Sequence, residues 1–178
     1  MKPLKAAAIL LTIAYPFMVY LGLQHFPAER LLPLLLLLLV LRWFSGNRPA
    51  ERPLLIAILV SVLAVGYLFG HQLGLKFYPA LVNVALLIVF AGSLLSPPSI
   101  IERIARLRDP QLSPAGVAYT ARVTLVWCLF FVINGSLAAA SALWASDEVW
   151  LLYNGFIAYL LMGLLFAGEW LVRQRVIH

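Results

Sequence analysis

Charged side chains are scarce in this 178-residue sequence. They make up 11% of it, whereas about 25% is usual for a soluble protein. Hydrophobic residues account for 63%, against roughly 45 to 50% in an average globular chain. So few charges provide too little polar surface to cover a water-soluble globule of this size. The composition therefore argues against a typical soluble domain and favours a protein embedded in a membrane.

Residues that form metal and catalytic sites are equally few. The single cysteine, Cys128, lies in an apolar run, so one chain cannot form a disulfide or a cysteine-based metal site. The three histidines lack the spacing of metal ligands. The one adjacent acidic pair, Asp147 and Glu148, has no further carboxylate nearby to help hold a magnesium ion. We therefore expect no catalytic residues, no metal and no cofactor, and we predict that the protein is not an enzyme.

Negative charge is especially rare. The sequence has seven Asp and Glu residues against 13 Lys and Arg residues, which gives a formal net charge of +6. A basic balance indicates nucleic-acid binding when the basic residues gather on one solvated face with base-contacting side chains. In this sequence they separate apolar runs instead. We therefore expect no nucleic-acid partner and interpret the positive charges as signals of membrane topology.

Six apolar runs are candidates for membrane spans. Backbone groups in hydrocarbon must be satisfied within the segment, and runs that are apolar on every side permit helices but not the alternating pattern of a β-barrel. We predict an all-α polytopic membrane protein that forms one integral membrane domain over residues 1–178. The predicted transmembrane helices are 4–23, 31–44, 54–69, 77–95, 118–143 and 150–171.

The second predicted span is short. Its fourteen residues would rise about 21 Å as a helix, against a hydrocarbon core of about 30 Å. Arg30 and Arg42 near its ends can extend their charges to the interfaces, and Trp43 and Phe44 suit an interfacial position. We interpret the run as a short true span, with a re-entrant segment as the alternative.

The placement of basic residues predicts the direction of each crossing. If all six runs cross and the amino terminus is cytoplasmic, every Lys and Arg except Arg30 and Lys76 falls on the cytoplasmic side. This distribution obeys the positive-inside rule. We therefore expect a multi-pass protein with both termini in the cytoplasm.

The connection between the fourth and fifth spans contains helix signals. Ser99 and Glu102 match a capping box, and Asp109 followed by Pro110 ends the pattern. The short amphipathic helix predicted near 99–108 can lie in the membrane interface. We predict that it contacts anionic headgroups through Arg103, Arg106 and Arg108. The alternative is an ordinary basic loop with one helical turn.

Two charged residues fall within the predicted hydrocarbon region of the last helical hairpin. Arg122 and Glu169 lie at nearly the same distance from the turn at residues 146 and 147, on opposite sides of it. An antiparallel hairpin brings them to a similar depth, where an ion pair would neutralise two charges that are costly to bury. We predict an intramembrane ion pair that holds the hairpin together, with a proton or substrate relay as the alternative.

Three asparagines, Asn83, Asn134 and Asn154, are further polar candidates within the spans. Amide side chains hydrogen-bond between membrane helices, and the adjacent Gly135 and Gly155 allow helices to approach closely. We expect these residues to make packing contacts. Lining of a polar cavity is the alternative.

The fifth predicted span resembles a family sequence. Arg122, Trp127, Leu129-Phe130-Phe131 and Gly135 have the spacing of the R-x4-W-x-LFF-x3-G stretch of the bacterial intracellular septation protein A (YciB-like) family. The likeness extends more loosely from about Phe77 to the last span. The chain is also similar to predicted membrane proteins that are encoded beside acyl carrier protein and ketosynthase genes.

The resemblance implies a protein of the bacterial inner membrane that serves septation or maintenance of the cell envelope. It implies action through protein partners or membrane lipids, and it transfers signature residues but no catalytic ones: Arg122, Trp127 and Gly135. The sequence leaves open a second function, a small transporter or flippase for a lipid or polyene-like product. That function would require one cavity lined jointly by Arg122, Glu169, Asn83, Asn134 and Asn154.

Overall fold

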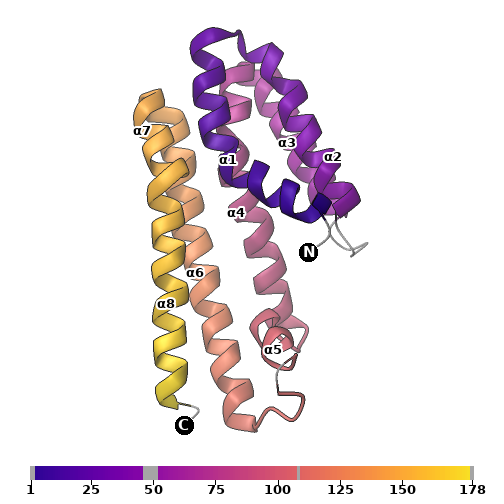
Figure 1. Cartoon of the computed structure of the whole chain (residues 1–178), viewed down its shortest axis with the longest axis vertical. Coiled ribbons are helices and arrows are strands. Elements are labelled where there is room, and N and C mark those ends of the chain that lie inside the picture. Colours follow the sequence, from indigo (N-terminus) through magenta and orange to yellow (C-terminus); the bar gives the residue numbers. More distant parts are fainter. Residues whose placement is uncertain (1–2, 46–51, 108, 177–178) are drawn as a thin grey trace.

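The computed structural model describes residues 3–45, 52–107 and 109–176, and within these ranges its regular structure is helical throughout (Figure 1). This confirms the predicted all-α class. The elements are α1 (Pro3–His25), the 3-10 helix η1 (Ala28–Leu31), α2 (Leu32–Ser45), α3 (Arg52–Phe69), α4 (His71–Leu95), α5 (Ile100–Ala105), α6 (Pro114–Trp144), α7 (Asp147–Leu152), the π-helical η3 (Tyr153–Ile157) and α8 (Ala158–Val176).

Four segments among the described residues are long and apolar enough to cross a membrane. They are Arg52–Phe69, His71–Leu95, Pro114–Trp144 and the continuous stretch Asp147–Gln174. They correspond to the last four of the six predicted spans. The first two predicted spans are not among them, so four candidate crossings are supported and the count of six is not.

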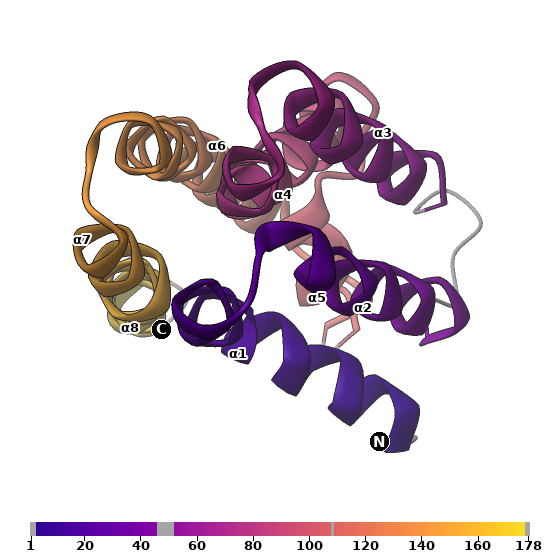
Figure 2. The same cartoon turned by 90° about the horizontal axis from the view of Figure 1, so that it is seen from above.

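The first helix is bent, in contrast to the single span predicted over 4–23. Figure 2 shows the amino-terminal part of α1 running across the view, whereas its carboxy-terminal part is seen end-on. Pro16 lies inside α1, and proline both removes a helical hydrogen bond and clashes with the preceding turn. The bend therefore has a local cause, and the amino-terminal part of α1 lies across the bundle rather than along it.

The long helices α4, α6 and α8 run along the long axis of the molecule (Figure 1). We call the end where α3 joins α4 and α6 joins α7 the upper end, as drawn there. Helix α4 packs between α3 and α6. Its approach to α3 requires glycine, since a Cβ at Gly74 would lie 2.7 Å from the carbonyl oxygen of Val62. This close contact holds α3 against α4.

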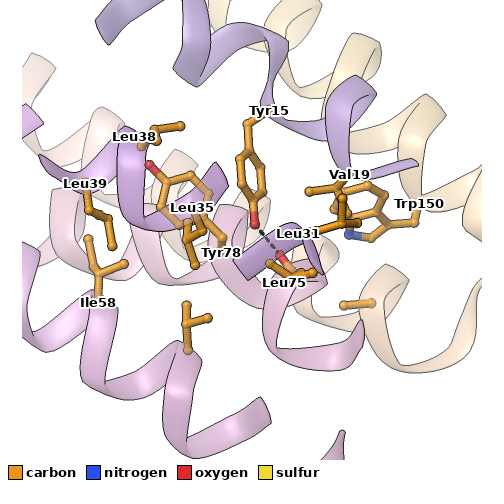
Figure 3. Packing of buried hydrophobic residues seen from close by; sticks show 12 residues of the cluster. Tyr15, Val19, Leu31, Leu35, Leu38, Leu39, Ile58, Leu75, Tyr78 and Trp150 are labelled. Carbon is orange, nitrogen blue, oxygen red and sulfur yellow. Dashed lines mark hydrogen bonds between the residues drawn. The ribbon is translucent and has the colours of Figure 1, made fainter. Parts of the chain in front are cut away.

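The main hydrophobic core lies between α1, α2, α3, α4 and α7. Tyr15, Leu35, Leu75 and Trp150 are almost completely buried there and point toward one another from four different helices (Figure 3). The aromatic rings of Tyr15 and Tyr78 pack with their centroids 4.5 Å apart. This core holds the bent helix α1 against the long helices.

The connection between α4 and α6 follows its sequence signals in part. Ser99 Oγ accepts a hydrogen bond from the Glu102 amide at 3.3 Å, and Ser113 Oγ accepts one from the Gly116 amide at 3.2 Å. The Glu102 carboxylate, however, accepts a hydrogen bond from Arg106 Nε at 2.8 Å. The capping box is therefore confirmed in its serine half, and the helix, Ile100–Ala105, is shorter than predicted.

Two of the three predicted headgroup arginines have partners within this connection. Arg103 Nε donates to the Pro98 carbonyl at 2.8 Å, and Arg106 donates both to Glu102 and to the Pro110 carbonyl, the latter at 3.0 Å. These bonds shape the connection itself. Arg108 lies outside the described residues, and headgroup contact by this segment stays a prediction.

Candidate functional site

Three irregular turns in three helices meet at one level of the bundle. Pro16 interrupts α1, Pro79 interrupts α4, and η3 inserts a π-helical turn between α7 and α8. Interrupted helices in membrane proteins often surround binding sites, because their freed backbone groups need partners from other elements. The partners of these freed groups define the candidate site.

The interruption in α1 is completed by α8. Because Pro16 has no amide hydrogen, the carbonyl of Thr12 loses its usual helical donor. The Tyr159 hydroxyl donates to this carbonyl at 3.3 Å. Arg42 of α2 donates from Nη2 to the Thr12 hydroxyl at 3.2 Å. The bend in α1 therefore draws a tyrosine and an arginine to the same point.

The interruption in α4 is completed in the same way by α1. Pro79 deprives the Leu75 carbonyl of its helical donor, and the Tyr15 hydroxyl donates to that carbonyl at 3.0 Å (Figure 3). The indole Nε1 of Trp150 donates to the neighbouring carbonyl of Lys76 at 3.1 Å. Each proline-interrupted helix is thus satisfied by an aromatic side chain from elsewhere in the chain.

Two asparagine side chains and a tyrosine connect α4, α6 and η3 by hydrogen bonds. Asn134 Nδ2 donates to Asn83 Oδ1 at 3.0 Å, and Tyr153 donates its hydroxyl to Asn134 Oδ1 at 2.8 Å. Asn83 Nδ2 in turn donates to the Pro79 carbonyl at 2.9 Å. Asn83 and Asn134 are both buried, so this network satisfies amide groups that would otherwise be costly to remove from water.

The π-helical turn also contains the third asparagine, which has hydrogen bonds of its own. Asn154 Nδ2 donates to Ser141 Oγ at 3.0 Å and to the Trp150 carbonyl at 2.9 Å. A π-turn contains an extra residue and changes the direction of successive side chains. As a result, the neighbours Tyr153 and Asn154 both reach side chains of α6.

These groups surround a cavity of about 250 Å³. We call it the Arg42 cavity, after the cation on its wall. Along the helix axes, its lining residues on α4, α6 and η3 lie about 10 to 23 Å from the upper end. Apolar side chains complete the wall, and among the described lining residues there is no carboxylate. The polar lining residues are Thr12, Tyr15, Arg42, Tyr78, Asn83, Asn134, Asn154 and Tyr159.

A salt bridge closes the bundle above the Arg42 cavity. Lys76 Nζ lies 2.9 Å from Asp147 Oδ1, and Gln72 Nε2 donates to Asp147 Oδ2 at 3.3 Å. The side chain of Lys76 is only 7% exposed. Sequence reasoning assigned Lys76 and Asp147 to outer connections, whereas the structure places both in helices and joins them.

The predicted partners Arg122 and Glu169 lie elsewhere, on the wall of a second cavity of about 590 Å³ between the lower halves of α6 and α8. The antiparallel hairpin does bring them to one place. The ion pair that forms there joins Glu169 Oε1 to Arg173 Nε at 3.8 Å, because a residue one helical turn away is on the same face of α8. The five residues required jointly for a transport cavity are therefore divided between two cavities.

Two of the signature residues of the fifth span, Trp127 and Gly135, pack against neighbouring helices. A Cβ at Gly135 would lie 3.0 Å from the Cβ of Asn83, so Gly135 allows α6 to approach α4. The ring of Trp127 packs against Phe90, Phe131 and Phe166, with a centroid separation of 4.5 Å to Phe166. Both residues support the asparagine network by holding α4, α6 and α8 together.

Sequence reasoning identified the three asparagines but missed Arg42, Thr12 and Tyr159 as their neighbours. Arg42 was assigned to the membrane interface because it ends an apolar run. The available signal was a proline inside each of two apolar runs, since such prolines release a carbonyl that needs a donor.

In the ranges that the structure describes, no three His, Cys, Asp or Glu residues are grouped so that they could hold a metal ion. The chain matches no protein-family model, no curated protein and no solved structure. The resemblance to the septation protein A family therefore stays a prediction.

Proposed function

We propose that this protein binds the anionic head of an amphiphilic molecule within the membrane, as a small transporter or flippase for such a molecule. The observation that carries the proposal is the Arg42 cavity, in which one guanidinium and three buried asparagines line a single space between interrupted helices. The jointly lined cavity that the sequence analysis required for transport does not form, because Arg122 and Glu169 line the other cavity. The proposal therefore rests on Arg42 and the three asparagines instead.

The chemistry of the lining supports an anionic ligand. Arg42 is exposed, and its guanidinium can form charge-assisted hydrogen bonds to a carboxylate or phosphate that enters the cavity. The Tyr78 hydroxyl and the second amide hydrogens of Asn83 and Asn134 can donate further hydrogen bonds. The hydroxyl hydrogen of Tyr159 is already donated to the Thr12 carbonyl. Ile13, Val82, Leu86 and Met162 provide an apolar wall beside them. This combination suits a molecule with a charged head and an apolar body.

The size and depth of the cavity support the same ligand class. About 250 Å³ is slightly below the roughly 300 to 1,000 Å³ of a typical small-molecule site, so the cavity suits a headgroup rather than a whole lipid. With the upper end at the outer interface, the depth of about 10 to 23 Å centres the cavity near the middle of a core of about 30 Å. Transporters commonly bind their substrates at this depth.

The binding proposal is tested with purified protein and a carboxylate- or phosphate-bearing amphiphile, such as palmitate or dodecyl phosphate. We expect Arg42→Gln to weaken binding at least tenfold, because it removes the charge while keeping the hydrogen-bonding side chain. Isothermal titration in detergent measures the affinity. Arg52→Gln is the matched control, since Arg52 lies over the ring of Trp43 outside the cavity.

Equal affinities of the wild type and Arg42→Gln would contradict the proposal. Movement of a fluorescent analogue between the leaflets of proteoliposomes separates transport from binding. Binding without any movement would assign the cavity to a receptor or structural role instead.

We further propose that both termini face the cytoplasm and that the upper end faces outward. The support is the distribution of basic residues. Arg30 and Lys76 lie toward the upper end, whereas the basic residues described in α5, its carboxy-terminal cap, the lower half of α6 and the end of α8 lie toward the lower end: Arg103, Arg106, Arg122 and Arg173. Alkaline phosphatase fused after Ser146 should be active, and the same fusion after Gln111 should be inactive. The opposite pattern, or equal activity at both positions, would overturn this orientation.

A role in septation or envelope maintenance at a bacterial inner membrane is compatible with this proposal. Its support is the resemblance of the fifth span, together with the basic cytoplasmic face. In that setting the protein would act without an enzymatic step, through protein partners or membrane lipids. Crosslinking in intact cells, followed by mass spectrometry, tests for such partners.

A further inference from the structure

The second cavity lies between the lower halves of α6 and α8, apart from the Arg42 cavity. At the upper end, α6 packs against α7 and η3, whereas lower down the two helices leave a space of about 590 Å³. No atom outside the helix lies near the Cα of Gly168 on this wall, because a Cβ built there would meet nothing within 4 Å. We call this space the α6–α8 cleft.

The wall of the α6–α8 cleft is largely apolar. On α6 it includes Val123, Val126 and Trp127, and on α8 it includes Leu165 and Val172. A cleft with such a wall suits a hydrocarbon chain better than water or a polar solute. The three polar residues on the wall are Tyr119, Arg122 and Glu169.

Charges at the cleft favour a negative ligand. Glu169 is paired with Arg173 at 3.8 Å, and the Tyr119 hydroxyl donates to the Glu169 carbonyl at 3.3 Å. Arg122 is exposed, and its side chain has no hydrogen bond or ion pair within the part of the chain that the structure describes. One positive charge on the cleft wall therefore lacks compensation by a protein carboxylate.

The depth of these residues matches that of a phospholipid in the inner leaflet. Along α6 and from α7 through α8, Arg122 and Glu169 lie about 33 Å from the upper end, while Val126 and Leu165 lie about 27 Å from it. If the upper end is at the outer interface, the charges fall just beyond a hydrocarbon core of about 30 Å and the apolar wall within it. In a phospholipid, likewise, the phosphate lies just outside the hydrocarbon core and the acyl chains lie within it.

We infer that the α6–α8 cleft is a binding site for an anionic phospholipid of the inner leaflet. The phosphate bonds to the guanidinium of Arg122, and one acyl chain lies against Val126, Trp127 and Leu165. This site depends on the proposed orientation but not on ligand binding in the Arg42 cavity. It gives the hairpin a structural lipid at the point where a protein ion pair had been predicted.

Native mass spectrometry of the full chain tests this inference, with phosphatidylglycerol and phosphatidylcholine added in equal amounts. The wild type should retain one phosphatidylglycerol in preference to phosphatidylcholine. Arg122→Gln should reduce that preference roughly tenfold, because a charge-assisted hydrogen bond is lost. Arg30→Gln, near the upper end, is the matched control and should keep the preference.

A second variant tests the apolar part of the cleft. Gly168→Phe places a large side chain in the α6–α8 cleft and should reduce retention of both lipids. An unchanged preference in Arg122→Gln, or retention of lipid without any headgroup preference in the wild type, would overturn the inference. A dimer that is present in the wild type and lost in Gly168→Phe would do so too, by assigning the cleft to a second copy of the chain. Arg42→Gln should leave this lipid in place, which separates failure here from failure of the proposed function.

Discussion

Asp147→Leu should lower the free energy of unfolding by about 2 to 4 kcal/mol, since removing one partner leaves a buried charge without compensation. Its partner Lys76 has a side chain that is 7% exposed and lies 2.9 Å from the carboxylate. In this variant the Gln72 amide also loses the Asp147 carboxylate as its hydrogen-bond acceptor. Thermal unfolding in detergent measures the loss.

The double variant Lys76→Met with Asp147→Leu should recover most of this stability, because a well-packed apolar pair needs no desolvation of charge. Glu148→Leu is the neighbouring control and should change stability little, since Glu148 is exposed. If Asp147→Leu and Glu148→Leu lower the unfolding temperature equally, the salt bridge has no special role in closing the bundle.

Tyr15→Phe should lower the free energy of unfolding by about 1 to 2 kcal/mol, because it removes the hydroxyl that satisfies a buried carbonyl. The hydroxyl donates to the Leu75 carbonyl at 3.0 Å, where Pro79 supplies no helical amide. The ring of Tyr15 stays in place in this variant, so the change isolates the hydrogen bond. Unfolding in a graded series of denaturing detergent measures it.

Pro79→Ala provides the decisive background for this prediction. Alanine at position 79 supplies an amide hydrogen to the Leu75 carbonyl, so Tyr15→Phe should have a much smaller effect in that background. A double-mutant cycle therefore reports whether the tyrosine completes the interrupted helix. Equal effects of Tyr15→Phe in both backgrounds would show that the tyrosine contributes through packing alone.

The two interrupted helices also give a physical reason for the position of the Arg42 cavity. A regular helix presents side chains to its neighbours, whereas an interrupted one also presents backbone carbonyls. Here the freed carbonyls of Thr12 and Leu75 recruit Tyr159 and Tyr15. The tyrosines bring α1, α4 and α8 around one space, and the asparagines complete it.

Local features of the fold could be predicted from the sequence because their causes are local. Apolar runs indicated helices, and the serine cap at Ser99 formed as expected. Four of the predicted spans have counterparts in segments long and apolar enough to cross a membrane. The asparagines could also be identified, because amides in apolar runs must find hydrogen-bond partners.

Composition and hydrophobic pattern by themselves determined that the described chain is helical and apolar enough for a membrane, since a helix satisfies most of its backbone within one segment. Only the tertiary structure decided which polar groups meet. Tyr15 and Leu75 are 60 residues apart in the chain, and Tyr159 and Thr12 are 147 apart. The tertiary structure also decided that Glu169 pairs with Arg173, while Arg122 lies on the wall of the α6–α8 cleft. Partners at such separations are chosen by how the helices bend and pack, and that geometry has no signature in any single segment.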